Sequence, residues 1–481
     1  MKDSKIIGSA MSWSALLNSG RLGHRPAKQE SGRNAFLRDH DKIIFSGAFR
    51  RLARKTQVHP LATNDHVHNR MTHSLEVSCV GRTLGIRVGE ALHARGLLPK
   101  GIEDTDLGDI VQSACLAHDI GNPPFGHTGE RAIRAWFEEQ GQSLLQGFDA
   151  NQRADLEWFE GNAQGFRILT KSEYHQYEDG MRLTYATLAT FLKYPWLSGV
   201  ARAGKTPRPD KYSTFSAERD ALFEVGNAAG LLREGDGALS SCQFARHPLA
   251  YLVEAADDFC YCVIDLEDGL EMDLLRWDEV QALLAPALPR SAEVKHLLQS
   301  NLRPGRKAAL LRGQVIEFLI DAGVRAFMQH HDVLLRGTLH AETGCSDLIS
   351  LCDQPARELV EGAKQLAKTR VFEHPRKVEL EIGAFQVIGT LLDHLVEAAL
   401  SLATDNSRSF RHQRLIHLIG EHTFPPQLFA PGNSGSGNGD WDDTERRYQC
   451  IMRAVDFLAG MTDNYATYLA KQFNGLAESR Y

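Results

Sequence analysis

The chain has 481 residues, a formal net charge of −7 and a pI of about 6.3, so its surface as a whole does not suit a polyanion and any anion site must be local. Hydrophobic residues make up 43% and charged residues 24%, the composition of a soluble globular protein with roughly two or three domains. We find no apolar run of membrane-spanning length and no apolar signal core near the start, so we expect no membrane segment. The eight cysteines form no Cys-x-x-Cys pair, which indicates reduced core thiols and a cytoplasmic protein.

The first segment, 1–32, is mixed and partly basic, which predicts a loose N-terminal arm. The pattern over 43–58 predicts one helix with an apolar face and a basic face. The apolar residues are Ile44, Phe45, Phe49 and Leu52, and the basic residues are Arg50, Arg51, Arg54 and Lys55. Such a basic face is either solvated or able to hold a phosphate group, and the cluster alone does not decide between them.

Two strongly helical stretches follow, at about 72–95 and 104–120, and each places a histidine near one end. His73 lies at the start of the first stretch, where a single histidine is more often structural than functional. The second stretch ends in His118-Asp119, an imidazole and a carboxylate that could bind one metal ion. His-Asp pairs also occur at 40–41 and 331–332, but only His118-Asp119 ends an apolar helix and leads into a Gly/Pro turn.

The turn after this pair carries further titratable groups. The Gly/Pro residues of 121–124 are expected to separate two helices, and Thr128 is a good N-cap for a next helix over 128–140. His127 and Glu130 lie three residues apart and can share a face. This order is typical of metal-assisted hydrolysis: an imidazole and a carboxylate, then a tight turn, then a second imidazole and carboxylate.

Two later stretches could face a charged ligand. The basic, Pro-containing segment 201–213 is either a plain surface loop or a flap that reaches such a ligand. Pro248 opens a long apolar helix in which Asp257, Tyr261 and Asp265 repeat every four residues along one stripe. Two carboxylates within an apolar helix need a partner, and a cation is the simplest one.

Helical patterns continue after residue 290 and end with a predicted long helix over about 443–473. The Gly-rich loop 431–439 follows no strand and lacks the Lys-Ser/Thr end of a P-loop. We find no convincing run of alternating strand residues and no internal repeat. These patterns together predict an all-α protein.

Three predicted helices therefore supply two imidazoles and two carboxylates, from His73, His118-Asp119 and Asp257. This set suits a borderline divalent ion and leaves coordination positions for water or a phosphate oxygen.

The chain also resembles a known family at six ordered blocks. They are Phe49-Arg50-Arg51-Leu52, Lys55-Thr56-Gln57-Val58, Arg70 to Glu76, the turn 118–130, Phe159 to Phe166, and Ala256 to Asp268. In this order they resemble the bacterial dGTPase-like deoxynucleoside triphosphate triphosphohydrolases of the HD superfamily of metal-dependent phosphohydrolases. The blocks cover about 45–270, with a weaker one at 459–463.

The resemblance implies an all-α fold with an HD-domain helical core over 33–290 and additional C-terminal helices over 291–481 packed on that core. It implies hydrolysis of a dNTP, dGTP or several dNTPs, to deoxynucleoside and intact triphosphate by water attack at the α-phosphorus. It also implies a homo-oligomer, a hexamer or a tetramer, with a dNTP or single-stranded DNA as a compatible effector.

The resemblance also assigns roles to individual positions. It implies that a divalent ion, Mn²⁺, Mg²⁺, Fe²⁺, Ni²⁺, Co²⁺ or Zn²⁺, is held by His73, His118, Asp119 and Asp257. His127 matches the catalytic histidine and Glu130 its carboxylate helper. The expected substrate contacts are Gln57, Arg50, Arg70, Asn122, Lys211, Tyr212, Tyr261 and Asp265. Asn122 stands where many relatives carry another histidine, which leaves His127 as the only imidazole of the turn.

Two other classes of function stay open at this point. One is an HD-type nucleotidase or phosphodiesterase that acts on other nucleotides, which the products of the reaction would reveal. The other is a non-enzymatic regulator that binds a nucleotide or single-stranded DNA, which a lack of turnover with any metal ion or nucleotide would favour. The preferred dNTP and the metal used in the cell cannot be predicted from these patterns.

Overall fold

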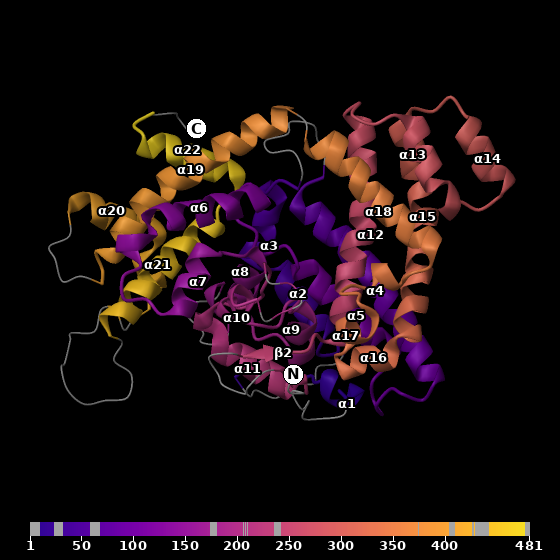
Figure 1. Cartoon of the computed structure of the whole chain (residues 1–481), viewed down its shortest axis with the longest axis horizontal. Coiled ribbons are helices and arrows are strands. Elements are labelled where there is room, and N and C mark those ends of the chain that lie inside the picture. Colours follow the sequence, from indigo (N-terminus) through magenta and orange to yellow (C-terminus); the bar gives the residue numbers. More distant parts are fainter. Residues whose placement is uncertain are drawn as a thin grey trace.

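The computed structural model describes residues 10–23, 32–57, 68–173, 180–204, 206, 208, 210–234, 242–373, 375–403, 409–425, 428 and 442–476 (Figure 1). Within these ranges the chain is predominantly helical, which confirms the predicted all-α fold. The exception is a small antiparallel pair of strands, β1 (Arg233–Glu234) and β2 (Gln243–Phe244), which the sequence patterns did not predict.

Three long helices form the centre of the protein. Helix α4 (Arg70–Ala94) packs along α5 (Asp104–Ala117), and α12 (Pro248–Glu271) crosses both. Glycines at every fourth position of α4 let the first two helices approach closely, because a Cβ at Gly85 would lie 2.7 Å from the carbonyl oxygen of Leu107. The predicted metal ligands His73 and Asp257 lie in α4 and α12, and His118 and Asp119 directly follow the end of α5.

Other helices surround this centre. Helices α2 (Leu37–Ile44) and α9 (Tyr185–Phe191) pack on α5, while α15 (Pro304–Gln329) and α18 (Gln354–Ala367) pack on α12. The remaining helices of the first 370 residues are α1 (Trp13–Leu16), α3 (Gly47–Arg51), α6 (Gly126–Leu144), α7 (Ala150–Glu157), α8 (Gly161–Arg167), α10 (Ser198–Arg202), α11 (Arg219–Ala228), α13 (Trp277–Leu284), α14 (Ala292–Gln299), α16 (His331–Arg336) and α17 (Leu339–Thr343). Short 3₁₀ or π turns occur at Leu52–Arg54, Ile168–Ser172, Ser216–Glu218, Ala285–Ala287, Ile349–Leu351, Lys368–Phe372 and Glu421–Thr423.

The last helices lie beside α6. Helix α19 (Pro375–Leu400) packs on α6 and also on α20 (Phe410–Ile419), α21 (Asp443–Ala459) and α22 (Asp463–Phe473), as Figure 1 shows at its upper left. By length and composition α19 is apolar enough to cross a membrane over Val378–Leu400, but half of its apolar window is buried inside the protein. A core helix of a soluble protein passes the same test, so this is weak evidence for a membrane span.

The described part of the N-terminal segment is packed rather than loose. The indole of Trp13 donates a buried hydrogen bond of 3.0 Å to Nε2 of His331, and Arg21 forms a 2.6 Å ion pair with the fully buried Asp39. Residues 1–9 and 24–31 of the predicted arm lie outside the described residues.

The helix predicted over 43–58 is wrong. Helix α2 ends at Ile44, and Ser46 caps a new short helix by accepting a hydrogen bond from the Phe49 amide. This break changes the expected faces, since Phe45 is 74% exposed and Lys55 is buried. Residue 58 lies outside the described residues.

Two other boundaries also differ from the prediction. The helix expected over 128–140 begins at Gly126 and continues to Leu144. The single helix expected over 443–473 is two helices, because α21 ends at Ala459 and Thr462 caps α22 through the Tyr465 amide. The short connection between them matters for the site described next.

Candidate functional site

Four side chains from the central helices converge, as the sequence predicted. His73 lies in the first turn of α4, His118 and Asp119 follow the end of α5, and Asp257 lies in the middle of α12. Ligand atoms of His73, His118 and Asp119 lie within 4.8 Å of one another. Oδ1 of Asp257 lies 3.0 Å from Nε2 of His73 and 3.5 Å from Nε2 of His118.

The protonation of His118 fits a metal ligand. Its Nδ1 lies 2.7 Å from the carbonyl oxygen of Cys115, so this nitrogen carries the proton and donates it. Its Nε2 therefore faces the carboxylates of Asp119 and Asp257, at 3.7 and 3.5 Å, and can offer a lone pair to a cation that displaces its proton. An imidazole oriented in this way beside two carboxylates is the arrangement of donors that a divalent cation needs.

The electrostatic potential at this cluster also favours a cation. Burial lowers the pKa of His118, but Asp119 and Asp257 outweigh it and raise that pKa to about 9. Burial raises the pKa of Asp119, whereas Arg70 and His118 lower it to about 2. Asp119 therefore stays ionised, and the cluster attracts positive charge.

Arg70 and Asn122, which were predicted to contact substrate, both contact Asp119. The Arg70 guanidinium donates to Oδ2 at 2.7 Å, and the Asn122 amide donates to Oδ1. Arg70 has room because Gly126 has no side chain, and a Cβ at Gly126 would collide with the guanidinium. The φ of 58° at Gly126 also favours glycine at this position. Arg70 is only 4% exposed, so its position suits orienting Asp119, a proposed metal ligand, better than binding a substrate that enters from solvent.

His127 and Glu130 form a hydrogen-bonded pair next to the cluster. Nδ1 of His127 lies 2.9 Å from one carboxylate oxygen of Glu130, and the other oxygen accepts the Gly161 amide at 2.8 Å. Burial would raise the pKa of Glu130, but the hydrogen bond and charge of His127 lower it to about 2. The carboxylate is thus fixed and ionised, while the His127 side chain is 70% exposed and its other nitrogen can reach a ligand.

Tyr261 and Gln57 form a second wall beside the cluster. The Tyr261 ring packs on His73 with 4.6 Å between ring centroids, and Gln57 donates to its hydroxyl at 2.5 Å. Asp265 is one helical turn further along α12 and is buried. Of the stripe predicted on this helix, the structure thus brings Asp257 and Tyr261 to the cluster, whereas the role of Asp265 stays a prediction.

Lys211 stands near the His127–Glu130 pair. Its ammonium lies 3.0 Å from a carboxylate oxygen of the buried Glu160, which also accepts a hydrogen bond from Arg134. Glu160 immediately precedes Gly161, the residue that binds Glu130. Arg134 and Glu160 were not among the predicted site residues, because no pattern of charges in the sequence distinguishes them.

The structure does not bring the other two predicted substrate contacts to the cluster. Tyr212 is completely buried and donates its hydroxyl to the carbonyl oxygen of Trp158, so its side chain belongs to the core. Arg50 is exposed and donates to the carbonyl oxygen of Phe45. Neither has a described contact with a proposed ligand, because Tyr212 points inward from its loop and the break in the predicted helix turns Arg50 outward.

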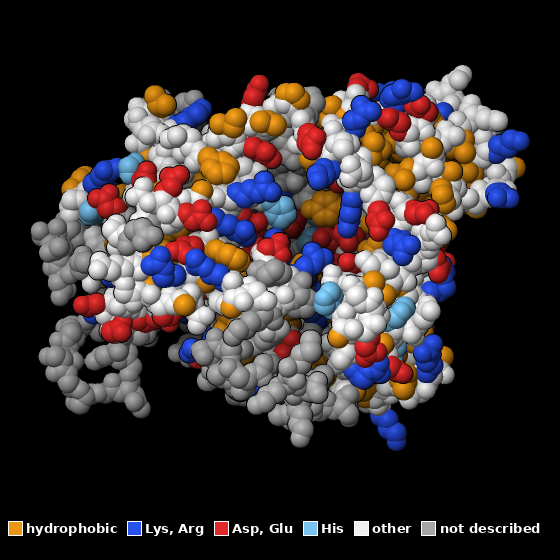
Figure 2. All heavy atoms as spheres, in the orientation of Figure 1, with side chains coloured by type: hydrophobic (Ala, Val, Ile, Leu, Met, Phe, Trp, Pro, Cys, Tyr) orange, Lys and Arg blue, Asp and Glu red, His pale blue; other side chains and the backbone are white. Residues whose placement is uncertain are grey.

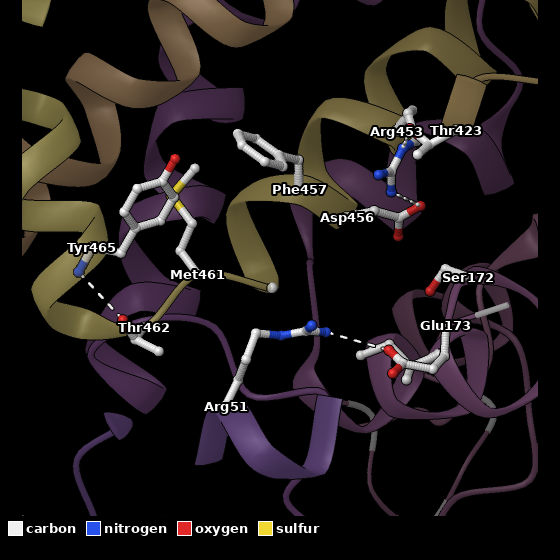
Figure 3. Close-up of a pocket in the computed structure, with 12 residues that line it drawn as sticks. Arg51, Ser172, Glu173, Thr423, Arg453, Asp456, Phe457, Met461, Thr462 and Tyr465 are labelled. Carbon is white, nitrogen blue, oxygen red and sulfur yellow. Dashed lines mark hydrogen bonds and ion pairs between the residues drawn. The ribbon is translucent and has the colours of Figure 1, made fainter. Parts of the chain in front are cut away.

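The face of the molecule in Figure 2 is hollowed between α6 and α12, with Lys, Arg, Asp, Glu and His side chains around the opening. A separate cavity of about 490 Å³ lies between α3 and the α21–α22 connection (Figure 3). Its charged residues are paired with one another, Arg51 with Glu173 and Arg453 with Asp456. This cavity contains none of the proposed ligands, so we do not assign the chemistry to it.

Comparisons with known proteins agree with this geometry. The HD domain family matches residues 70–163, which include three of the four proposed ligands and the His127–Glu130 pair. A deoxyguanosinetriphosphate triphosphohydrolase-like protein of Pseudomonas aeruginosa is 46% identical over 97% of this chain and 99% of its own length. A protein of the same name from Synechocystis is 38% identical over 97% of this chain and its entire length.

A deoxyguanosinetriphosphate triphosphohydrolase of Cronobacter sakazakii is 31% identical over 90% of this chain and 92% of its own length. The similarity thus extends far beyond the HD match, through α12 and the C-terminal helices. The chain belongs to the deoxyguanosinetriphosphate triphosphohydrolase-like family of HD-domain hydrolases.

Proposed function

We propose that this protein hydrolyses a deoxynucleoside triphosphate to deoxynucleoside and inorganic triphosphate by attack of water at the α-phosphorus. The observation that carries the proposal is the convergence of four side chains that could hold a metal ion next to the His127–Glu130 pair. The names of the relatives support the same substrate class.

The proposed ligands are His73, His118, Asp119 and Asp257, whose donor types fit Mn²⁺, Mg²⁺ or another divalent transition-metal ion. When bound, such an ion supplies a Lewis acid for the phosphate and lowers the pKa of water. Asp119 is held in place from both sides by Arg70 and Asn122. These two residues are therefore proposed to act mainly through the ligand that they orient.

The proton transfer is assigned to His127. Because Glu130 accepts the proton on Nδ1, the other nitrogen of His127 can take a proton from the attacking water or give one to the leaving 5′-oxygen. Lys211 is proposed to bind a phosphate oxygen of the substrate, for which it would give up part of its ion pair with Glu160. Tyr261, with Gln57 on its hydroxyl, is proposed to lie against the deoxyribose and to exclude a 2′-hydroxyl.

The test is a product assay with each dNTP and NTP in the presence of Mn²⁺ or Mg²⁺. We expect deoxynucleoside and triphosphate from at least one dNTP, and water labelled with ¹⁸O should place the label in the triphosphate. Pyrophosphate with dNMP as products would overturn the proposal. Label in the 5′-hydroxyl of the nucleoside would refute attack at phosphorus.

Two further predictions rest on the family resemblance, a hexameric or tetrameric homo-oligomer and a dNTP or single-stranded DNA as effector. A third prediction, a cytoplasmic location, rests on the cysteine pattern of the sequence. Mass measurement in solution, with and without each nucleotide or a short single-stranded DNA, tests the first two. A monomer under all conditions would contradict the first prediction.

A further inference from the structure

The connection between α21 and α22 reaches the active-site turn through a buried lysine. The Lys55 ammonium donates to the carbonyl oxygen of Asn122 at 2.5 Å and to that of Ala459 at 2.6 Å. Ala459 is the last residue of α21, and 404 positions separate it from Lys55. One side chain thus ties the turn that follows Asp119 to the C-terminal helices.

Asp463, the first residue of α22, makes a second connection. One oxygen of its carboxylate accepts the Phe125 amide at 3.0 Å, and the other accepts the Thr56 amide at 2.9 Å. Phe125 lies two residues before His127, and Thr56 immediately precedes Gln57. A single carboxylate that is only 2% exposed therefore holds the backbone on both walls of the proposed site.

The turn needs such a restraint because of its backbone conformation. Phe125 has a φ of 63°, a region that a bulky residue rarely adopts, and Gly126 follows with a φ of 58°. A backbone of this kind persists only when its surroundings fix it. Among the described residues, the Phe125 amide is held by the Asp463 carboxylate.

We propose that Asp463 is a positioning residue of the active site, which together with Lys55 fixes the distance between the wall that carries His127 and the wall that carries Gln57. The described hydrogen bonds of Asp463 go to the Thr56 and Phe125 amides and not to the proposed metal ligands, so it acts through the backbone of the two walls. The kinetic consequence of this proposal rests on the proposed function. The restraint of the two walls does not depend on which substrate is bound.

The sharpest test is Asp463→Asn. An amide of the same size has one acceptor oxygen, so it can accept one of the two N–H groups and must turn its own NH₂ toward the other. We expect kcat per metal-loaded site to fall about 10-fold to 100-fold, the loss typical of a small misplacement of reacting groups. KM is expected to stay within about threefold, because the phosphate and sugar contacts remain.

The matched control is Asp443→Asn. Asp443 is the first residue of α21, as Asp463 is of α22, so this variant removes the same favourable charge at a helix N-terminus without touching the site. It is expected to keep the wild-type kcat. Asp463→Glu, which retains both acceptor oxygens on a longer stem, should recover part of the lost rate.

Amide hydrogen exchange provides a readout that does not need turnover. In the wild type, peptides that contain the Thr56 and Phe125 amides should exchange slowly, and in Asp463→Asn they should exchange at least about tenfold faster. Peptides from α4 and α12 and the bound metal content should not change. This pattern separates a local role in positioning from a general loss of folding.

Two results would overturn the proposal: a wild-type kcat in Asp463→Asn, or fast exchange of both amides in the wild type. If the wild type hydrolyses no dNTP, the proposed function fails, while the exchange data still decide whether Asp463 restrains the two walls. If the wild type is active and Asp463→Asn equals it, the positioning role alone fails.

Discussion

Replacing His127 by alanine should separate chemistry from binding. The His127 side chain is 70% exposed, and its described hydrogen bond goes to the buried Glu130 carboxylate, so its removal should lower the free energy of unfolding by about 1.5–3 kcal/mol, the usual contribution of a hydrogen bond to a charged group. Loss of a general acid–base group typically costs about 10²–10⁴ in rate, or about 3–5 kcal/mol in the activation barrier. We therefore expect His127→Ala to keep its metal and its dNTP affinity and to lose kcat by that factor.

The measurement combines single-turnover kinetics with elemental analysis of the purified variant. Glu130→Gln should lose less, about 10-fold to 100-fold, because it orients the imidazole and does not itself transfer the proton. His93→Ala is the control, since His93 is another exposed histidine and lies in the last turn of α4, away from the site. A wild-type kcat in His127→Ala, or metal loss as complete as in a ligand variant, would refute the assigned role.

Three other predictions follow from the site and its support. His118→Ala and Asp257→Ala should each lose bound metal in elemental analysis, and full retention in both would disprove the ligand assignment. Tyr261→Ala should reduce the preference for a hydrolysed dNTP over the matching NTP in kcat/KM by about tenfold or more, and an unchanged preference would place the sugar elsewhere. Burial would raise the pKa of Glu254, but Arg246 and a neighbouring lysine lower it to about 2. Because this pKa lies below the usual 4.5, the carboxylate contributes about 3 kcal/mol of stability above pH 4.5, and this is lost as the pH falls toward 2. In urea unfolding, the stability difference between wild type and Glu254→Gln should thus shrink by about half from pH 7 to pH 3, and a constant difference would contradict this reasoning.

The helices that carry the proposed ligands could be predicted because local sequence defines them. Asn69 caps α4 with its side chain, and Pro248 occupies the first turn of α12, where its missing N–H costs nothing. Spacing by four residues then puts Asp257 and Tyr261 on one side of α12, and the structure shows both beside His73. Helix breaks within short segments were harder to predict. The cap at Ser46, for example, interrupts a residue pattern that is typical of one continuous helix.

Contacts between segments that are distant in the sequence could not be predicted from residue patterns. Lys55 belongs to a basic cluster in the sequence, yet it is buried because carbonyl groups of the turn and of α21 accept its hydrogen bonds. The two N–H groups that Asp463 accepts are backbone groups, which every non-proline residue possesses, so residue types cannot reveal them. The region that matches the HD domain, 70–163, contains neither Asp463 nor the fourth proposed ligand, Asp257. With the roles proposed for Asp257 and Asp463, the catalytic unit extends through α12 to the start of α22, and the relatives likewise match nearly the whole chain.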